Sequence, residues 1–177
     1  QDDPKIKKLL EEVKDREFIG YSYDGADASF ELLARRIMGE IPRYISIKEY
    51  DVSVKKNSSG EIISSAKAKL EVDKKLILCE GEGNGPVHAL DNAIRKNVDK
   101  LAKYSQYLKD LKLVDYKVRI LNTGTEAVTR VSIESTDSKG KNWFTIGVSA
   151  NIIDASFKAL VDSLDYKLFK DKAPASL

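Results

Sequence analysis

The sequence predicts an α+β fold, in which two βββα repeat units related by a pseudo-two-fold axis follow a small helical connector subdomain. An apolar pattern that begins at Ile45 starts again at Leu111 and keeps this offset of 66 residues through most of both copies. Near Tyr44 the spacing of apolar residues changes from helical to alternating, and each copy ends in a stripe with helical spacing. We therefore predict a connector at residues 1–40 and a duplicated domain at residues 41–177, with repeats at about 44–104 and 110–170.

The offset of 66 residues copies an irregularity as well as a pattern. Its strand positions are Ile45, Ile47, Tyr50, Val52 and Val54, which recur as Leu111, Leu113, Tyr116, Val118 and Ile120. Both copies slip in phase between the second and third positions, and such a slip flips the buried face of a strand, so it predicts a bulge. Further on, Gly81 recurs as Gly147, Ala89 as Ala155 and Ala93 as Ala159. Two copies of one unit bury their apolar faces against each other, so we expect a ligand site on or near the pseudo-two-fold axis.

Two amphipathic helices are expected in the connector. The first lies in a charged segment from about Pro4 to Arg16, which carries one stripe of Ile6, Leu9, Leu10 and Val13. The second carries the stripe Ala26, Phe30, Leu33 and Ile37 and ends before Gly39. These helices are too small to fold alone, and the chain starts at Gln1 rather than at a methionine. We therefore expect them to join the repeats to a preceding part of a larger protein.

Each repeat is expected to run strand, strand, strand, helix. In the first, a hairpin turns at residues 57–60, a third strand passes through Leu76–Leu78, and a helix opens at Gly85-Pro86 and continues to Leu101. In the second, strands follow from Leu111, Ala127 and Phe144, and the last helix carries Ile153, Phe157, Leu160, Leu164 and Leu168. The tail at residues 172–177 has no periodicity and is expected to fray.

The composition excludes several classes of partner. Its 30 basic and 28 acidic residues are spread along the chain and give a net charge of +2, which favours neither nucleic acid nor an anionic membrane. The single cysteine, Cys79, excludes internal disulfides and is interpreted as a buried structural thiol. No signal peptide and no bilayer-length apolar stretch is present, so we expect a soluble, cytoplasmic protein.

The inventory of catalytic side chains is small. His88 is the only histidine, so the sequence has no imidazole cluster for a metal and no base to pair with a nucleophile. On the first turn of a helix it is interpreted as a surface or capping residue. Glu80 and Glu82 could contact a ligand ammonium, but solubility of an edge strand explains them equally well. We predict no catalytic and no metal-binding residue in this chain.

The most distinctive segment is the glycine-rich turn at residues 81–87. Its glycines permit close approach of the backbone, and Pro86 suits the first position of a helix. The exposed N–H groups of such a helix start can hold a carboxylate or a phosphate, although a tight turn with a good cap explains the residues as well. The second repeat has small residues and a cap at the corresponding place, so we expect the two openings to converge on a small zwitterion with an apolar tail. The effector-binding candidates are Gly83, Asn84, Gly85, Pro86, Val87, Tyr116, Ala127, Thr129, Ser149, Ala150, Asn151 and Ile152.

Long motifs in both repeats support a specific resemblance. They are Gly83–Val87, Ala89–Arg95, Leu113–Leu121, Gly124-Thr125, Thr129–Val131, Ile133–Ser135, Trp143, Gly147–Ser149 and Asn151–Ser156. This set resembles the C-terminal regulatory domain of the 2-isopropylmalate and citramalate synthases, and it covers nearly the whole chain. Gly20-Tyr21 and Gly25–Leu33 are similar to the connecting subdomain of the citramalate branch.

The resemblance implies a role in feedback inhibition. In that family a barrel with a divalent metal condenses acetyl-CoA with a 2-oxo acid, and the regulatory domain forms a homodimer and binds the amino acid that ends the pathway. None of the barrel is expected in this chain, which would be catalytically silent and without cofactor, whereas the full protein would be an acyltransferase. The effector is expected near the Gly-Asn-Gly-Pro turn and its copy, between the repeat units.

Three readings follow from the resemblance. The first is isoleucine binding, which the citramalate-like connector favours over leucine binding in a 2-isopropylmalate synthase. The second is a dimerisation module without a working effector site, because Glu80 and Glu82 stand where the other repeat has Ile146 and Val148. The third, an independent enzyme, is disfavoured because the sequence lacks a base and nucleophile pair.

Overall fold

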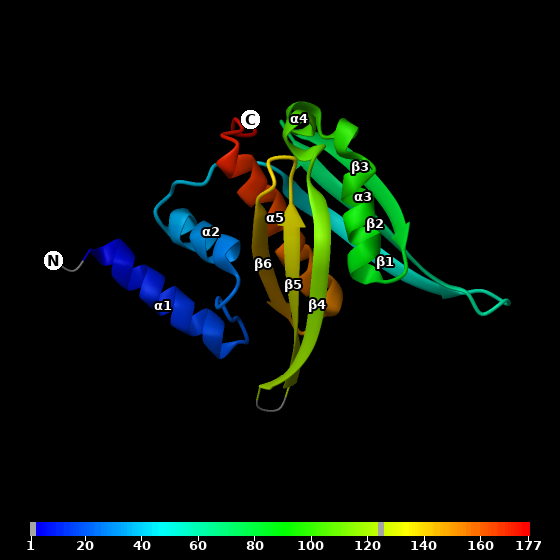
Figure 1. Cartoon of the computed structure of the whole chain (residues 1–177), viewed down its shortest axis with the longest axis horizontal. Coiled ribbons are helices and arrows are strands. Elements are labelled where there is room, and N and C mark those ends of the chain that lie inside the picture. Colours follow the sequence, from blue (N-terminus) through cyan, green and yellow to red (C-terminus); the bar gives the residue numbers. More distant parts are fainter. Residues whose placement is uncertain (1–2, 124–125) are drawn as a thin grey trace. The chain divides into compact units, whose positions relative to one another are not determined.

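A computed structural model describes residues 3–123 and 126–177 and confirms an α+β fold with two βββα repeats (Figure 1). The chain divides into two compact units. The connector unit consists of Gln1–Pro42 and Lys112–Tyr166, and the glycine-turn unit consists of Arg43–Leu111 and Lys167–Leu177. The connector helices thus fall in the same unit as the strands of the second repeat. The pseudo-two-fold relation between the repeats stays a prediction.

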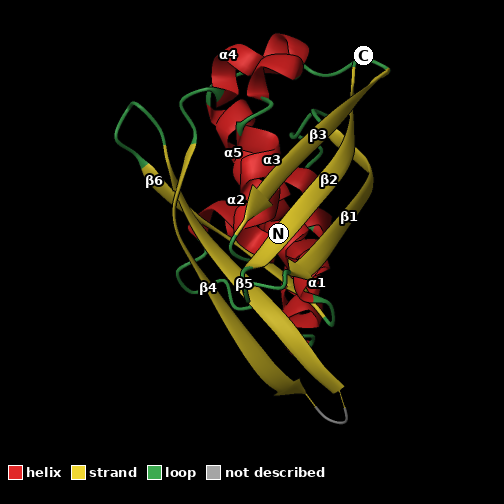
Figure 2. Ribbon diagram, turned by 90° about the vertical axis from the view of Figure 1, so that its right-hand side faces the viewer, coloured by secondary structure: helices red, strands yellow, loops and turns green. Residues whose placement is uncertain are grey.

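In the glycine-turn unit, one helix covers one face of a three-stranded antiparallel sheet. The strands β1 (Ser46–Lys56), β2 (Ile62–Val72) and β3 (Lys75–Gly83) follow one another in the sheet order β1-β2-β3 (Figure 2). The helix α3 (Pro86–Arg95) packs on β2 and β3. Alternate residues of β2 point to this face and form the core with Cys79 and the inner side of α3, namely Ala66, Ala68, Leu70 and Val72, each at most 1% exposed.

In the connector unit, both faces of the sheet are covered. The strands β4 (Lys112–Thr123), β5 (Glu126–Thr136) and β6 (Asn142–Ser149) again pair in chain order, and α5 (Ile152–Lys170) follows them. Thr145 Oγ1 donates to the carbonyl of Ala159 at 2.8 Å, which places α5 on one face. On the other face, α2 (Asp27–Ile37) packs on β6, and α1 (Pro4–Phe18) packs on α2 (Figure 1). The first α5 residues and the connector therefore sandwich this sheet.

The predicted bulges are confirmed in both copies. The pairing of β1 with β2 shifts register between Ile47 and Glu49, and the pairing of β4 with β5 shifts between Leu113 and Asp115. These pairs of positions are 66 residues apart, as the sequence pattern requires. Each bulge restores the helix-facing side for the second half of its strand, so that Tyr50 and Tyr116 lie opposite buried residues of the neighbouring strands.

The repeated glycines and alanines hold each helix close to its sheet. A Cβ atom at Gly147 would lie 2.8 Å from the amide nitrogen of Ala159 and closer still to the carbonyl oxygen of Ala155. In the other unit, a Cβ at Gly81 would overlap the backbone of Ala93 in the same way. Because the neighbouring atoms belong to the helix backbone, these two positions accept only glycine.

The helix of the first repeat, α3, is shorter than the sequence predicts. The prediction of a helix through Val98 to Leu101 is wrong, since α3 ends at Arg95 and is followed by the short turns η1 (Val98–Lys100), η2 (Ala102–Tyr104) and α4 (Ser105–Leu108). The Asn97 side chain donates to the carbonyl of Ala93 at 2.7 Å and to that of Glu80 at 3.0 Å. Such side-chain bonds compete with helix continuation. Val98 and Leu101 are nevertheless buried, so their apolar pattern reports burial and not helix.

The C-terminal tail is held in place, which contradicts the expected fraying. Ser176 N donates to the carbonyl of Arg43, Leu177 N donates to Asp73 Oδ1, and Tyr104 Oη donates to the carbonyl of Pro174, each at 2.8 Å. The pKa of Asp73 is lowered, first by its hydrogen bond with Lys103 and then by that with Leu177. All of these contacts lie within the glycine-turn unit, so specific hydrogen bonds order a segment that has no periodic pattern.

Candidate functional site

The glycine-rich turn leads into a helix start without a side-chain cap. Gly85 is the N-cap of α3, with φ −160° and ψ 175°, and its position has open space around it. Asn84 N donates to His88 Nδ1 at 3.3 Å, so His88 serves the turn as the sequence suggested. The first N–H groups of a helix have no partner inside the helix, and here no side chain supplies one. The α3 N-terminus therefore presents backbone donors and the positive end of the helix dipole.

The corresponding helix start in the second repeat is already capped. Asn151 Oδ1 accepts hydrogen bonds from Ile153 N at 2.8 Å and from Asp154 N at 3.2 Å, and Ser149 Oγ accepts one from Asn151 N at 3.2 Å. Asp154 adds a carboxylate to the first turn. Ala150 and Ile152 flank this cap. An anion at the α5 N-terminus would have to displace the Asn151 side chain, so the two helix starts differ in what they can bind.

The remaining candidates share one face of the sheet in the connector unit. Thr129 lies opposite Ser149 on β6 and Ile120 on β4, and Tyr116 lies opposite the fully buried Ile133. By the alternation of strands, Ala127 points to the same side as Thr129, which is the side that carries α5. Tyr116 is 40% exposed. The structure thus groups Gly83–Val87 in one unit and Tyr116, Ala127, Thr129 and Ser149–Ile152 in the other, and the meeting of the two groups stays a prediction.

Both edge strands expose apolar side chains on the helix-bearing side of their sheets. Val54 is 61% exposed on β1, and Ile120 is 75% exposed at the position 66 residues later on β4. Tyr50 and Tyr116 extend these rows. We call these exposed side chains the apolar edge rows.

Glu80 and Glu82 do not enter a pocket behind the glycine turn. Both alternate with Cys79 and Gly81, so they lie on the face of the β1-β2-β3 sheet opposite α3, where Lys67 Nζ approaches Glu80 Oε1 at 3.9 Å. Their counterparts Ile146 and Val148 are 2% and 3% exposed because the connector covers that face of the other sheet. The two charges thus lie on a sheet face that α3 does not cover, and whether the effector site works stays untested by this geometry.

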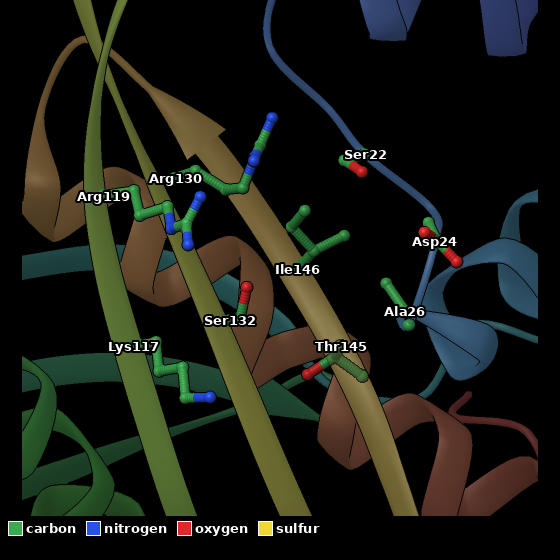
Figure 3. A pocket seen from close by; sticks show the side chains of 10 residues that line it. Ser22, Asp24, Ala26, Lys117, Arg119, Arg130, Ser132, Thr145 and Ile146 are labelled. Carbon is green, nitrogen blue, oxygen red and sulfur yellow. The ribbon is translucent and has the colours of Figure 1, made fainter.

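A pocket of about 180 Å³ in the connector unit escaped the sequence analysis (Figure 3). The connector segment forms one wall, and the outer faces of β4, β5 and β6 form the other. Its lining residues are Ser22, Asp24, Gly25, Ala26, Lys117, Arg119, Arg130, Ser132, Thr145 and Ile146. A comparison of the two repeats could have indicated this pocket. The second repeat has Lys117 and Arg119 at the positions where the first has Asp51 and Ser53.

A partly exposed polar cluster joins the connector to the second repeat. Arg36 Nη1 donates to Asp162 Oδ1, and Arg36 Nη2 donates to Asp165 Oδ2, both at 2.9 Å. Ser29 Oγ donates to Asp162 Oδ2 and accepts a hydrogen bond from Ile146 N, again at 2.9 Å. Burial raises the pKa of Asp165 to about 7, because desolvation outweighs the opposing charge of Arg36 and the Asp162 carboxylate adds repulsion.

This raised pKa predicts a loss of stability as the pH rises from about 4 to neutrality. The unfolded chain releases the Asp165 proton near pH 3.8, whereas the native state holds it to about 7, so the contribution is complete below the lower value and is lost as pH rises through the higher one. We expect Asp165→Asn to flatten the pH dependence of the unfolding free energy between about pH 4 and 7 by a few kcal/mol. Urea unfolding across this range measures it, with the exposed Asp51→Asn as control. Parallel curves for Asp165→Asn and wild type would contradict the assignment.

Other candidate groups carry no chemistry in the described residues. Cys79 is fully buried, as the sequence predicted, and burial raises the pKa of its thiol. Within residues 3–123 and 126–177, no group of histidine, cysteine or acidic side chains could hold a metal ion, and no helix has the length and apolar character needed to span a membrane. Gly124-Thr125, part of the family resemblance, lies outside the described residues.

Comparison with known proteins points to one family. The model of the LeuA allosteric (dimerisation) domain matches residues 24–168. The (R)-citramalate synthases of Geobacter sulfurreducens and Aquifex aeolicus are each 44% identical over 96% of this chain, which spans 32% of their lengths. The 2-isopropylmalate synthase of Pseudoalteromonas atlantica is 32% identical over 62% of the chain and is matched over 19% of its own length. The chain thus spans about a third of the length of the first two relatives.

Proposed function

Given that this chain belongs to the LeuA allosteric (dimerisation) domain family, we propose that it is the feedback-regulatory region of an (R)-citramalate synthase and that it binds isoleucine. The observation that carries this proposal is the 44% identity to two (R)-citramalate synthases over 96% of the chain. The similarity to a 2-isopropylmalate synthase is weaker and shorter. The whole protein would be an acyltransferase that uses acetyl-CoA and a divalent metal in a catalytic barrel.

The α3 N-terminus is the proposed position of the effector carboxylate. It has unpaired helix donors, open space at Gly85 and no competing side-chain cap, whereas Asn151 occupies the donors of α5. Pro86 stands half-buried at this opening, but the Val87 side chain is 2% exposed and packs into the core. Val87 would therefore support the turn, and the apolar branch of the ligand would meet other surfaces.

A homodimer is part of the same proposal. The apolar edge rows of β1 and β4 are exposed at matching positions of both repeats, and apolar rows of this kind are typical of subunit interfaces. Isoleucine would act by binding one dimer arrangement more tightly than another, with a coupling free energy of about 1 to 3 kcal/mol. The connector would carry this bias to the catalytic part of the full protein.

Substitutions at Gly85 test the position of the carboxylate. Gly85→Asp supplies α3 with its own carboxylate cap, so we expect at least tenfold weaker isoleucine binding, roughly the loss of one charge-assisted contact, together with an unchanged or raised melting temperature. Gly85→Ala adds a neutral atom in open space and is the matched control, expected to keep binding. Calorimetric titration with isoleucine, leucine and valine gives the affinities, and sedimentation velocity gives the oligomeric state.

Each outcome of these titrations decides between the readings. Leucine as the tightest ligand would favour the 2-isopropylmalate branch. A dimer that shows neither heat nor a thermal shift with any of the three amino acids would favour a dimerisation module. Equal isoleucine affinities of Gly85→Asp and wild type would place the carboxylate elsewhere.

A further inference from the structure

Three cations line one wall of the pocket in the connector unit. Lys117 and Arg119 project from β4 and Arg130 projects from β5, and all three face the connector segment that carries Ser22 and Asp24 (Figure 3). We call this site the basic pocket. Asp24 is the single carboxylate among its described lining residues, so three positive charges face one negative charge and two remain uncompensated.

The two arginines oppose each other directly across the strands. Arg119 and Arg130 are cross-strand partners, and like charges in that position destabilise a sheet. Neither arginine, nor Lys117, forms an ion pair with a carboxylate of the described residues. The pKa of Arg130 is lowered by desolvation and by the charge of Arg119. The arrangement therefore has an electrostatic cost that an anion between the guanidinium groups would relieve.

The connector segment that faces these cations is held against the sheet by specific contacts. Arg130 Nε donates to the carbonyl of Gly20 at 2.9 Å, which fixes the guanidinium and leaves its terminal N–H groups as donors. A Cβ at Gly20 would lie 3.2 Å from side-chain atoms of Val128 and Val148, so the connector rests directly on the sheet. The pocket is thus formed before any ligand arrives, which lowers the entropic cost of binding.

The first repeat has the same fold but lacks the three cations at the equivalent positions. At the equivalent positions of its outer face stand Asp51 and Ser53 on β1, and Ser65, the partner of Ser53, on β2. Two lysines of that face lie near carboxylates, Lys67 at 3.9 Å from Glu80 and Lys69 at 3.2 Å from Glu49. Unpaired cations occur on the sheet whose outer face the connector covers. The shared fold alone does not require them.

From this geometry we propose that the basic pocket binds a small dicarboxylate of four or five carbons. Residues two apart on one strand are separated by about 7 Å, and direct cross-strand partners by about 5 Å. Arg119 and Arg130 thus form one anion position, and Lys117 with its partner Ser132 forms a second one further along the strands. A dicarboxylate spans both positions and neutralises the two excess charges, while a compact phosphate reaches only one. This site is separate from the proposed isoleucine site and stands whether or not isoleucine binds.

The test is a titration of the chain with succinate, inorganic phosphate and acetate, followed by the ¹⁵N amide shifts of Gly25, Arg130 and Ser132. Succinate is expected to saturate these shifts with a dissociation constant of about 1 mM or below. Arg119→Gln removes an exposed cation of the pocket and should weaken succinate binding roughly tenfold. Lys112→Gln removes a cation from the same strand outside the pocket and should leave the affinity unchanged. Arg130→Lys keeps the charge but loses the planar fork and should also weaken binding.

The outcomes separate specific binding from general electrostatics. Binding that weakens in Arg119→Gln and persists in Lys112→Gln supports the proposal. No saturation by succinate up to about 10 mM, or equal weakening by both glutamine variants, overturns it. Tighter binding of phosphate than of succinate overturns the ligand class. Amide spectra of the free variants that match wild type verify that each variant is folded.

Discussion

Alanine at Gly147 is expected to lower the free energy of unfolding by at least about 3 kcal/mol, the largest effect of a single methyl group that we foresee in this chain. The added Cβ would lie 2.8 Å from the amide nitrogen of Ala159 and would overlap the carbonyl of Ala155. These atoms belong to the backbone of α5, so relief requires the whole helix to move away from β6. Gly81→Ala is expected to behave similarly against α3.

The matched control for Gly147→Ala is Gly85→Ala. Gly85 has an extended backbone, and a Cβ there meets nothing within 4 Å, so this variant isolates the effect of the methyl group from that of the close contact. Urea unfolding monitored by the fluorescence of the single tryptophan, Trp143 on β6, reports the local packing. Equal stabilities of the two alanine variants would show that helix and sheet are not in close contact in solution.

A glutamate at position 146 is the second change with a large expected effect. Ile146 is 2% exposed beneath the connector, and Ile146→Glu places there the residue that the first repeat has at its equivalent position, Glu80. Loss of the buried aliphatic side chain and of its apolar contact with Tyr21 and Ala26 is expected to cost at least about 3 kcal/mol. The connector should detach, because the apolar contact that holds it to β6 is lost.

The reciprocal substitution is the control for this prediction. The Glu80 side chain is 56% exposed on an uncovered face, so Glu80→Ile is expected to change stability by less than about 1 kcal/mol. Limited proteolysis of the segment at residues 19–26, together with thermal unfolding, distinguishes detachment of the connector from global unfolding. Protection of this segment in Ile146→Glu would contradict the covered face that the structure shows.

The sequence predicted the repeated elements because their information is local. Alternation and helical spacing gave the strands and the long helix α5, and the shared slip gave both bulges. Helical spacing gave a wrong prediction after Arg95. Val98 and Leu101 continue the apolar spacing and are buried, but they do not lie in α3. Periodicity records which residues are buried, and it cannot record that the Asn97 side chain takes up the carbonyl that a continuing helix would use.

The candidate site was predicted in part for the same reason. The glycines and Pro86 predicted a helix start, and the structure shows that no side chain caps it. The sequence did not predict that the Asn151 side chain accepts hydrogen bonds from the first N–H groups of α5. It also did not predict that Arg119 lies directly opposite Arg130. The second fact depends on the register of β4 against β5, which the pattern of residue types alone does not fix.

By itself the sequence determined the duplication, including the recurrence of Gly81 as Gly147, and the family to which the chain belongs, since each is written as a fixed spacing of residue types. Only the tertiary structure decided which outer sheet face is covered, and thereby why Ile146 and Val148 are apolar where Glu80 and Glu82 are charged. The physical reason is that a strand pattern specifies two faces, while the cover of a face comes from residues more than a hundred positions away. The basic pocket arises from that long-range contact.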